Sequence, residues 1–255
     1  MIKIFDCHLH TRHSWDSEEP MQTYCRRAVA LGIDAICFTD HLDFQEEELG
    51  YYKPEAYFAE LERAREEFAD RLLILAGLEI SEPHLHQDEL ERANRWPYDF
   101  ILGGMHFWGY PYFNVMDKAD YPACCVAYWE AMRAMVSCGG FDALAHLDFP
   151  KRYLRCLEYE PQVLDEIFAL LIKNNIVLEI NTSSLRWGLT EPMPGEALLR
   201  QYISHGGRYV TLGSDAHRAA DLYAHVPEVR AWAEGFGLES VYFKERKMIR
   251  TGNNL

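Results

Sequence analysis

The sequence predicts an α/β fold in which parallel strands form a barrel, closed or slightly distorted. Two observations favour this class. Short apolar segments alternate with longer amphipathic ones along the whole chain, and side chains of the kinds that bind metals follow the ends of the apolar segments. The length of 255 residues agrees with a single barrel, since an α/β barrel takes about 250 residues.

Seven short apolar segments have the character of strands that are buried on both faces. They span residues 3–7, 35–39, 72–78, 100–104, 143–145, 176–180 and 209–212. An eighth strand is not evident in the sequence. The segment 241–249 fits either a strand or a surface extension, and both interpretations stay open.

Helical patterns separate the strands. They cover residues 23–31, 54–69, 121–136, 161–173, 194–205 and 219–236. The first helix is expected to end at Gly32, because glycine commonly terminates helices, and the second begins with Pro54, which the first turn tolerates. No internal repeat, low-complexity tract or linker interrupts the pattern, so we expect one domain over residues 1–255.

The composition argues against several classes of function. A net charge of −15 without a basic stripe does not suit binding to a nucleic-acid backbone. No apolar segment approaches the roughly 20 residues that span a bilayer, and the chain enters a strand without a signal-peptide pattern. Seven irregularly spaced cysteines without a CxxC pair are typical of reduced thiols. We therefore expect a cytoplasmic protein that binds neither membranes nor nucleic acid; the oligomeric state has no signal in the sequence.

Nine potential metal ligands follow the predicted strands. They are His8, His10, Asp16, His41, Glu79, His106, His146, Asp215 and His217. Imidazole and carboxylate groups bind zinc, manganese and iron, and the active site of an α/β barrel lies at the carboxyl ends of its strands. A lone histidine is more often a hydrogen-bonded or surface residue, but the common placement of all nine favours one polynuclear site. The histidines at positions 13, 84, 86, 205 and 225 lack this placement and are expected in loops or at the surface, with His13 close to the first pair.

The motifs His8-x-His10, Thr39-Asp40-His41 and Gly213-Ser214-Asp215-Ala216-His217 resemble the PHP superfamily, named for polymerase and histidinol phosphatase domains. With Gly77-Leu78-Glu79, His106 and His146, the resemblance covers essentially the whole chain in the family's order. It implies a distorted (β/α)7 barrel of PHP type and three divalent metal ions, whose identity as zinc, iron or manganese the donor types leave open.

The resemblance also implies how the ligands are shared. His8, His10, Glu79 and Asp215 would hold the first ion, and Glu79 would bridge to a second ion held by His106 and His146. Asp16, His41 and His217 would hold the third, although relatives can offer histidine at the place of Asp16.

We expect the nucleophile to be a hydroxide formed from a water that bridges the first two ions, because bound cations lower the pKa of water. The same cations neutralise the charge of the phosphate oxygens. Three ions with three carboxylates leave about three positive charges, which would attract a phosphate. Glu79 and Asp215 thus belong to the catalytic set. The acid that protonates the leaving group stays open between Asp215 and a water on the third ion.

Two segments point to the substrate. Residues 146–153 and 181–186 each place an arginine, Arg152 and Arg186, at the rim, where guanidinium groups grip phosphate oxygens. Both segments resemble the histidinol-phosphate phosphatase branch of the superfamily. Ser183 and Trp108 are predicted substrate contacts, Asn181, Asp40 and Asp148 are predicted to orient ligands, and residues 108–120 are a possible lid.

The expected activity is that of a metal-dependent phosphomonoesterase that converts L-histidinol phosphate and water to L-histidinol and phosphate in histidine biosynthesis. One alternative is a PHP phosphoesterase that acts on another small phosphate ester or on a nucleotide diester. A second, from a different class, is an inactive metal-binding regulatory module. The presence of all nine ligand types favours the enzyme.

Overall fold

The computed structural model describes residues 2–46, 48–109, 118–154 and 158–251. Its strands are β1 (Phe5–Leu9), β2 (Ala35–Phe38), β3 (His41–Leu42), β4 (Leu73–Ser81), β5 (Phe100–Gly104), β6 (Ala143–Leu144), β7 (Val177–Asn181), β8 (Tyr209–Gly213), β9 (Glu239–Lys244) and β10 (Lys247–Arg250). Its α-helices are α1 (Met21–Leu31), α2 (Pro54–Phe68), α3 (Gln87–Ala93), α4 (Tyr121–Cys138), α5 (Lys151–Leu154), α6 (Pro161–Asn174), α7 (Ser183–Arg186), α8 (Glu196–Ser204) and α9 (Val226–Gly235). Two short 3₁₀ turns, η2 (Lys118–Asp120) and η3 (Ala219–Asp221), complete the set.

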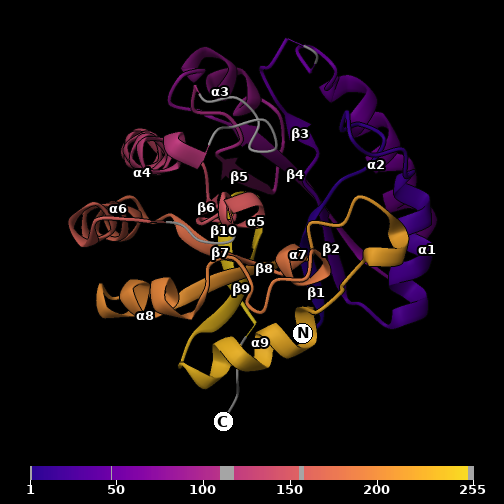
Figure 1. Ribbon diagram of the computed structural model, residues 1–255. Helices are drawn as coiled ribbons and strands as arrows, with labels where there is room; N and C mark the ends of the chain where they lie inside the picture. Colours follow the sequence, from indigo (N-terminus) through magenta and orange to yellow (C-terminus); the bar gives the residue numbers. More distant parts are fainter. Residues whose placement is uncertain (1, 47, 110–117, 155–157, 252–255) are drawn as a thin grey trace.

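The strands follow one another in a single curved sheet of order β1-β2-β4-β5-β6-β7-β8-β9-β10, with β3 beside β4. Every pairing is parallel except the one between β9 and β10. Two backbone hydrogen bonds also link β1 to the segment that follows β8: Asp215 N–H donates to His8 O and His10 N–H donates to Ala216 O, each over 2.9 Å. The helices surround the strands in Figure 1, so the predicted α/β fold of distorted-barrel type is confirmed.

Apolar side chains pack in two layers, one on each face of the sheet. The larger layer lies between the sheet and the surrounding helices. The smaller fills the barrel interior with Phe5, Cys7, Phe100 and Val177, and β9 adds Val241. Burial on both faces is what the continuously apolar strands predict.

The inward face of the strands changes from apolar to polar along the chain direction. Alternate residues of a strand share a face. The side chains of β4 that face the barrel interior are therefore those of Leu75 and Glu79, with Gly77 between them, and those of β7 are Val177 and Glu179. In β1 the pairing register shifts between Asp6 and Leu9. Such a bulge re-aims side chains, and it lets His8 turn inward although Cys7 already does. Polar groups therefore gather at the carboxyl end of the barrel.

Some boundaries differ from the predictions. The tail forms the β9–β10 hairpin, so the strand interpretation of segment 241–249 is correct. The helix predicted from residue 219 begins only at Val226, because His225 has a left-handed φ of 62° and Pro227 lies in the first turn. The short elements β3, α3, α5 and α7 carry too few residues to show a periodicity. Within the described ranges, no helix is both long and apolar enough to cross a membrane.

Candidate metal centre

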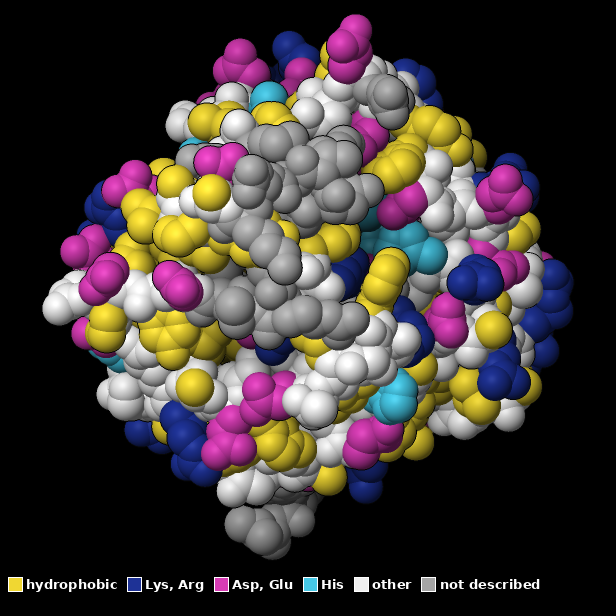
Figure 2. All heavy atoms as spheres, viewed as in Figure 1, with side chains coloured by type: hydrophobic (Ala, Val, Ile, Leu, Met, Phe, Trp, Pro, Cys, Tyr) yellow, Lys and Arg dark blue, Asp and Glu magenta, His cyan; other side chains and the backbone are white. Residues whose placement is uncertain are grey.

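The structure brings the nine predicted ligands together at the carboxyl end of the barrel, in two groups that differ in burial. The inner donor cluster, with at most 6% of each residue exposed, consists of His8, His10, Glu79, His146 and Asp215. The outer donor cluster, with side chains 9% to 30% exposed, consists of Asp16, His41, His106 and His217. Figure 2 shows histidine side chains to the right of the centre of the view, bordered by hydrophobic and charged ones.

Glu79, at the end of β4, lies at the centre of the inner donor cluster. Its Oε2 is 3.0 Å from His8 Nε2 and 3.4 Å from His10 Nε2. Its Oε1 is 2.9 Å from His146 Nε2 and 3.4 Å from His106 Nε2. Oε2 also lies 3.2 Å from His41 Nδ1. Because the two oxygens face different imidazoles, the carboxylate could bridge two cations.

Asp215 closes the inner donor cluster from the end of β8. Its Oδ1 lies 3.3 Å from His10 Nε2, and its Oδ2 accepts hydrogen bonds of 3.0 Å from both Ser183 and Arg152. The residue has a φ of 54°, which non-glycine residues seldom adopt. The hydrogen bonds hold the carboxylate in this orientation.

Asp16 Oδ2 faces two other members of the outer donor cluster, His217 Nε2 at 2.8 Å and His41 Nε2 at 3.6 Å. The fourth member, His106, faces Glu79 instead. The ring of His10 is stacked between the rings of His41 and His217, with centroid distances of 4.1 and 4.2 Å. His10 therefore belongs to both groups of donors, and the resemblance had placed it only with the first ion.

Three histidines donate their Nδ1–H away from the centre. His8 donates to Glu179, His10 to Ser14 over 3.1 Å, and His106 to Ser81 over 2.8 Å. The two serines in turn donate to buried aspartates, Ser14 to Asp40 and Ser81 to Asp43. These hydrogen bonds occupy Nδ1 of each ring and leave Nε2 as the atom that faces the centre.

The donors fit divalent cations. His8 Nε2 and His10 Nε2 face each other at 2.9 Å, and His106 Nε2 and His146 Nε2 at 3.3 Å. Each residue of the triads His8–His10–Glu79 and Glu79–His106–His146 and of the tetrad His10–Asp16–His41–His217 offers a ligand atom within 4.8 Å of the others. Imidazole and carboxylate donors at such spacing suit zinc, iron or manganese.

The electrostatics agree with this interpretation. Burial raises the pKa of Glu79, but His8, His106 and His41 together lower it well below its usual range, so the carboxylate stays ionised. Burial and the neighbouring rings of His41 and His217 lower the pKa of His10 to about 3. His10 is therefore neutral at pH 7 and has a lone pair to offer.

Two carboxylates of this centre were not predicted. Glu179 of β7 accepts the Nδ1–H of His8 over 2.6 Å. Asp43 lies 3.6 Å from His41 Nδ1 and 3.5 Å from His106 Nδ1, and these charges hold its pKa at about 2 although burial raises it. The sequence held a signal for Glu179, an acidic residue inside an apolar strand, whereas the position of Asp43 depends on how β3 meets β4.

Glycines make room for these contacts. A Cβ at Gly213 would lie 2.3 Å from His8 Cβ and 2.4 Å from Glu179 Oε1. A Cβ at Gly104 would lie 2.9 Å from Glu79 Oε1. Atoms cannot approach so closely, so both strands need glycine where they pass the ligands.

A cavity of about 940 Å³ opens over the donors. Its walls include the predicted substrate contacts Arg152, Arg186, Ser183 and Trp108. They also include the aromatic side chains Trp15, Phe107, Phe149, Tyr153 and Trp187. Tyr110 and most of the proposed lid, residues 110–117, lie outside the described residues.

The two arginines have different surroundings. Arg152 donates to Ser183 over 2.6 Å and to Asp215 Oδ2 over 3.0 Å, and its guanidinium lies 5.0 Å from the ring centre of Phe149. Arg186 donates to the backbone carbonyls of Ser214 and Asp215 over 2.7 and 2.9 Å. Arg186 therefore holds the Asp215 turn, while Arg152 contacts the donor carboxylate itself.

The orienting residues act less directly than expected. Asp40 accepts from Thr11 N–H and Ser14, so it reaches His10 through Ser14 rather than its neighbour His41. Asp148 pairs with Lys151 at 2.7 Å. Adjacency in the sequence did not determine these partners: neighbouring side chains of an extended chain point in opposite directions, which separates Asp40 from His41, and Asp148 lies in a turn.

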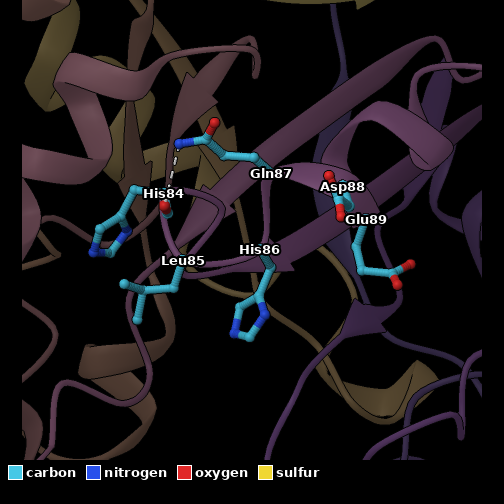
Figure 3. A pocket seen from close by; sticks show the side chains of 6 residues that line it. All are labelled: His84, Leu85, His86, Gln87, Asp88 and Glu89. Atoms are coloured by element: carbon cyan, nitrogen blue, oxygen red, sulfur yellow. Dashed lines mark hydrogen bonds between the residues drawn. The ribbon is translucent and has the colours of Figure 1, made fainter.

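The remaining histidines lie apart from the donors. His13, His205 and His225 pair with Glu60, Asp165 and Glu228. His84 and His86 line a separate hollow of about 410 Å³ before α3, where their rings point in different directions (Figure 3). None of the nine predicted ligands lines that hollow. His84 and His86 lie in the loop before α3, where the sequence predicted them.

Comparisons with known proteins agree with the motifs. The PHP domain model matches residues 6–183. The chain is 27% identical over 248 residues to a probable histidinol-phosphatase of Thermotoga maritima, covering 96% of this chain and 98% of that protein. It is 27% identical over 257 residues to the histidinol-phosphatase of Lactococcus lactis, covering 94% of each. 

Among solved structures, the fold matches histidinol phosphate phosphatase from Lactococcus lactis, complexed with zinc, L-histidinol and phosphate. The TM-score is 0.85 at 26% identity, over 98% of this chain and 100% of that one. Since the family model covers well over half of the chain, this protein belongs to the PHP domain family.

Proposed function

We propose that this chain is a metal-dependent phosphomonoesterase that hydrolyses L-histidinol phosphate to L-histidinol and phosphate in histidine biosynthesis. One observation carries the proposal: the nine predicted ligands gather beneath a cavity that seven of them line, and Arg152 and Arg186 lie in its wall. The named activity of the Thermotoga and Lactococcus relatives, similar over nearly their full length, supports the substrate. A single PHP metallohydrolase domain over residues 1–255 is part of the proposal.

The proposed ligand sets keep the assignment that the resemblance implies. One divalent ion would be held by His8, His10, Glu79 and Asp215, a second by Glu79, His106 and His146, and a third by Asp16, His41 and His217. Bound divalent ions supply a nucleophile at neutral pH and neutralise the charge of phosphate oxygens. The chain's contribution is to fix the donors, which the relays through Ser14 and Ser81 accomplish.

Arg152 is the residue we assign to phosphate binding. Its guanidinium is held by Ser183 and Asp215 and packs against the rings of Phe149 and Trp187, at 5.0 and 5.4 Å from the ring centres. A guanidinium fixed in this way presents its charge at the cavity wall without the entropy cost of ordering a free side chain.

Asp215 suits a ligand better than a proton donor. Burial raises its pKa, but His8, His10 and Arg152 lower it well below its usual range, so the group stays ionised. An ionised Asp215 has no proton to donate, so a water on the third ion is the better source of the proton for the leaving group.

The decisive experiment measures phosphate release from L-histidinol phosphate after metal removal and reconstitution with manganese, zinc or iron. The comparators are p-nitrophenyl phosphate, a nucleoside monophosphate and bis-p-nitrophenyl phosphate. Metal-dependent turnover of histidinol phosphate, well above the comparators, supports the proposal. Preference for another ester would replace the substrate, and bound metal without any turnover would favour a binding module.

Two variants distinguish the roles of Arg152 and Arg186. For Arg152→Ala we expect a fall in kcat/KM of about 100-fold, or about 2.7 kcal/mol of transition-state stabilisation, with the metal content unchanged. For Arg186→Ala we expect a substantial loss if the residue grips phosphate or positions Asp215, also with unchanged metal. Unaltered kinetics of Arg186→Ala would remove that residue from the site.

A further inference from the structure

Strand β7 supplies none of the predicted metal ligands, yet it carries a carboxylate into the floor of the centre. Glu179 is 0% exposed and lies between the apolar residues of its strand. A buried charge is costly unless partners compensate it. The hydrogen-bond partners of Glu179 therefore indicate its role.

The two oxygens of Glu179 bind two different strands. Oε1 accepts the Nδ1–H of His8 over 2.6 Å, and Oε2 accepts the backbone N–H of His146 over 3.0 Å. Asn181 donates to the same Oε2 over 3.3 Å. Glu179 thus links β1 to the turn after β6.

Both contacts bear on donors that face Glu79. The bond to Glu179 occupies Nδ1 of His8, so Nε2 is the ring atom that faces Glu79 Oε2, 3.0 Å away. His146 has a φ of 25°, an uncommon backbone conformation. Its amide is held by Glu179, while its Nε2 lies 2.9 Å from the other oxygen of Glu79.

We propose that Glu179 is a positioning residue that fixes two metal positions at once, through the ring of His8 on one side of Glu79 and the turn of His146 on the other. The inference rests on the proposed ligand sets, in which these histidines serve different ions. Gly213 belongs to the same arrangement, because a Cβ there would lie 2.4 Å from Glu179 Oε1.

The test measures zinc affinity rather than turnover. Wild-type protein, Glu179→Gln and Glu179→Asp are equilibrated with zinc in graded chelator, and bound zinc per chain is determined by mass spectrometry. In Glu179→Gln the charge is lost and an amide N–H₂ would face the His146 amide. We expect affinity at two positions to fall together by about 10- to 100-fold, the usual effect of removing a carboxylate behind a metal-bound histidine.

Glu179→Asp keeps the charge but reaches only one of the two partners, so its affinity should lie between the other two. Glu166→Gln is the matched control, because Glu166 is exposed on α6 and pairs only with Arg133 among the described residues, at 3.4 Å. Thermal unfolding in excess chelator reports whether the metal-free fold is intact. If Glu179→Gln does not fold, Glu179→Asp decides alone.

Zinc affinity equal to wild type in the folded Glu179 variants would overturn the proposal, and so would a loss confined to one position in Glu179→Gln. A wild-type protein that binds no zinc would instead overturn the proposed metal centre. A wild-type protein that binds zinc but leaves histidinol phosphate intact would overturn the substrate and leave the comparison of variants valid.

Discussion

The inner and outer donor clusters use the same side-chain types but are held in different ways. Inner residues sit at strand ends, are nearly inaccessible and are fixed by further groups: His8 by Glu179, His10 by Ser14, and Asp215 by Ser183 and Arg152. In the outer cluster, Asp16 lies on a loop and its carboxylate contacts only other donors among the described residues.

The difference teaches how such a centre is organised. Backbone pairing and buried hydrogen bonds determine the inner geometry before any ion binds, so little reorganisation is needed there. His106 of the outer cluster is also held, by Ser81, but around Asp16 the geometry depends on mutual contacts between partly exposed side chains, whose attraction solvent screens. We therefore expect the inner positions to bind metal more tightly and the outer position to exchange and respond to pH.

The largest effect is expected for Glu79→Gln. This change removes the charge that faces both inner positions, so bound metal should fall by at least two ions per chain. The value of kcat/KM should fall by about 1,000-fold or more, equal to about 4 kcal/mol. Metal analysis and steady-state kinetics check this; retention of both ions would show that Glu79 is not the bridge.

Asp16→Asn should affect the outer position alone. One ion is lost, the inner ions stay, and kcat/KM falls by about 100-fold. The measurement is the same metal analysis under graded chelator. Loss of all ions together would mean that the two clusters are not separable.

The pH dependence comes next. Burial lowers the pKa of His41, but Asp43, Glu79 and Asp16 raise it to about 10. A protonated ring cannot bind a cation, so metal affinity at the outer position should rise about tenfold per pH unit between about pH 7 and 9, with proton release. Metal titration with a pH indicator tests this.

The same group affects the stability of the metal-free protein in the opposite direction. The folded pKa of His41 lies above the ordinary value of 6.5, so its contribution is complete below pH 6.5 and is lost as the pH rises towards about 10. The neutral His10, with a pKa near 3, has no proton to release in this range. A metal affinity at the outer position that stays constant between about pH 7 and 9 would contradict the assignment of His41 as a ligand.

The smallest effect is expected for Trp187→Ala. Trp187 is 57% exposed, and its ring contacts the Arg152 guanidinium at 5.4 Å. Such contacts contribute about 0.5–1 kcal/mol, so kcat/KM should fall about two- to fivefold, with all ions retained. A loss as large as that of Arg152→Ala would show that the ring contacts substrate.

The sequence by itself determined the class of fold and the region of the site. Donors that follow parallel strands must meet, because the carboxyl ends of the strands lie at one end of a barrel. Glu79 and Asp215 could be identified in this way without knowledge of the turns between strands, and the family motifs fixed the order of the ligands.

Only the tertiary structure decided which groups support the ligands. The pairing of Glu179 with His8 depends on the bulge in β1 and on the approach of Gly213, and Asp43 meets His106 through the pairing of β3 with β4. The direction of Arg186, towards carbonyl groups rather than the cavity centre, depends on the turn after β8. These contacts join residues far apart in the chain, and a one-residue change of register would turn each side chain to the other face of its strand.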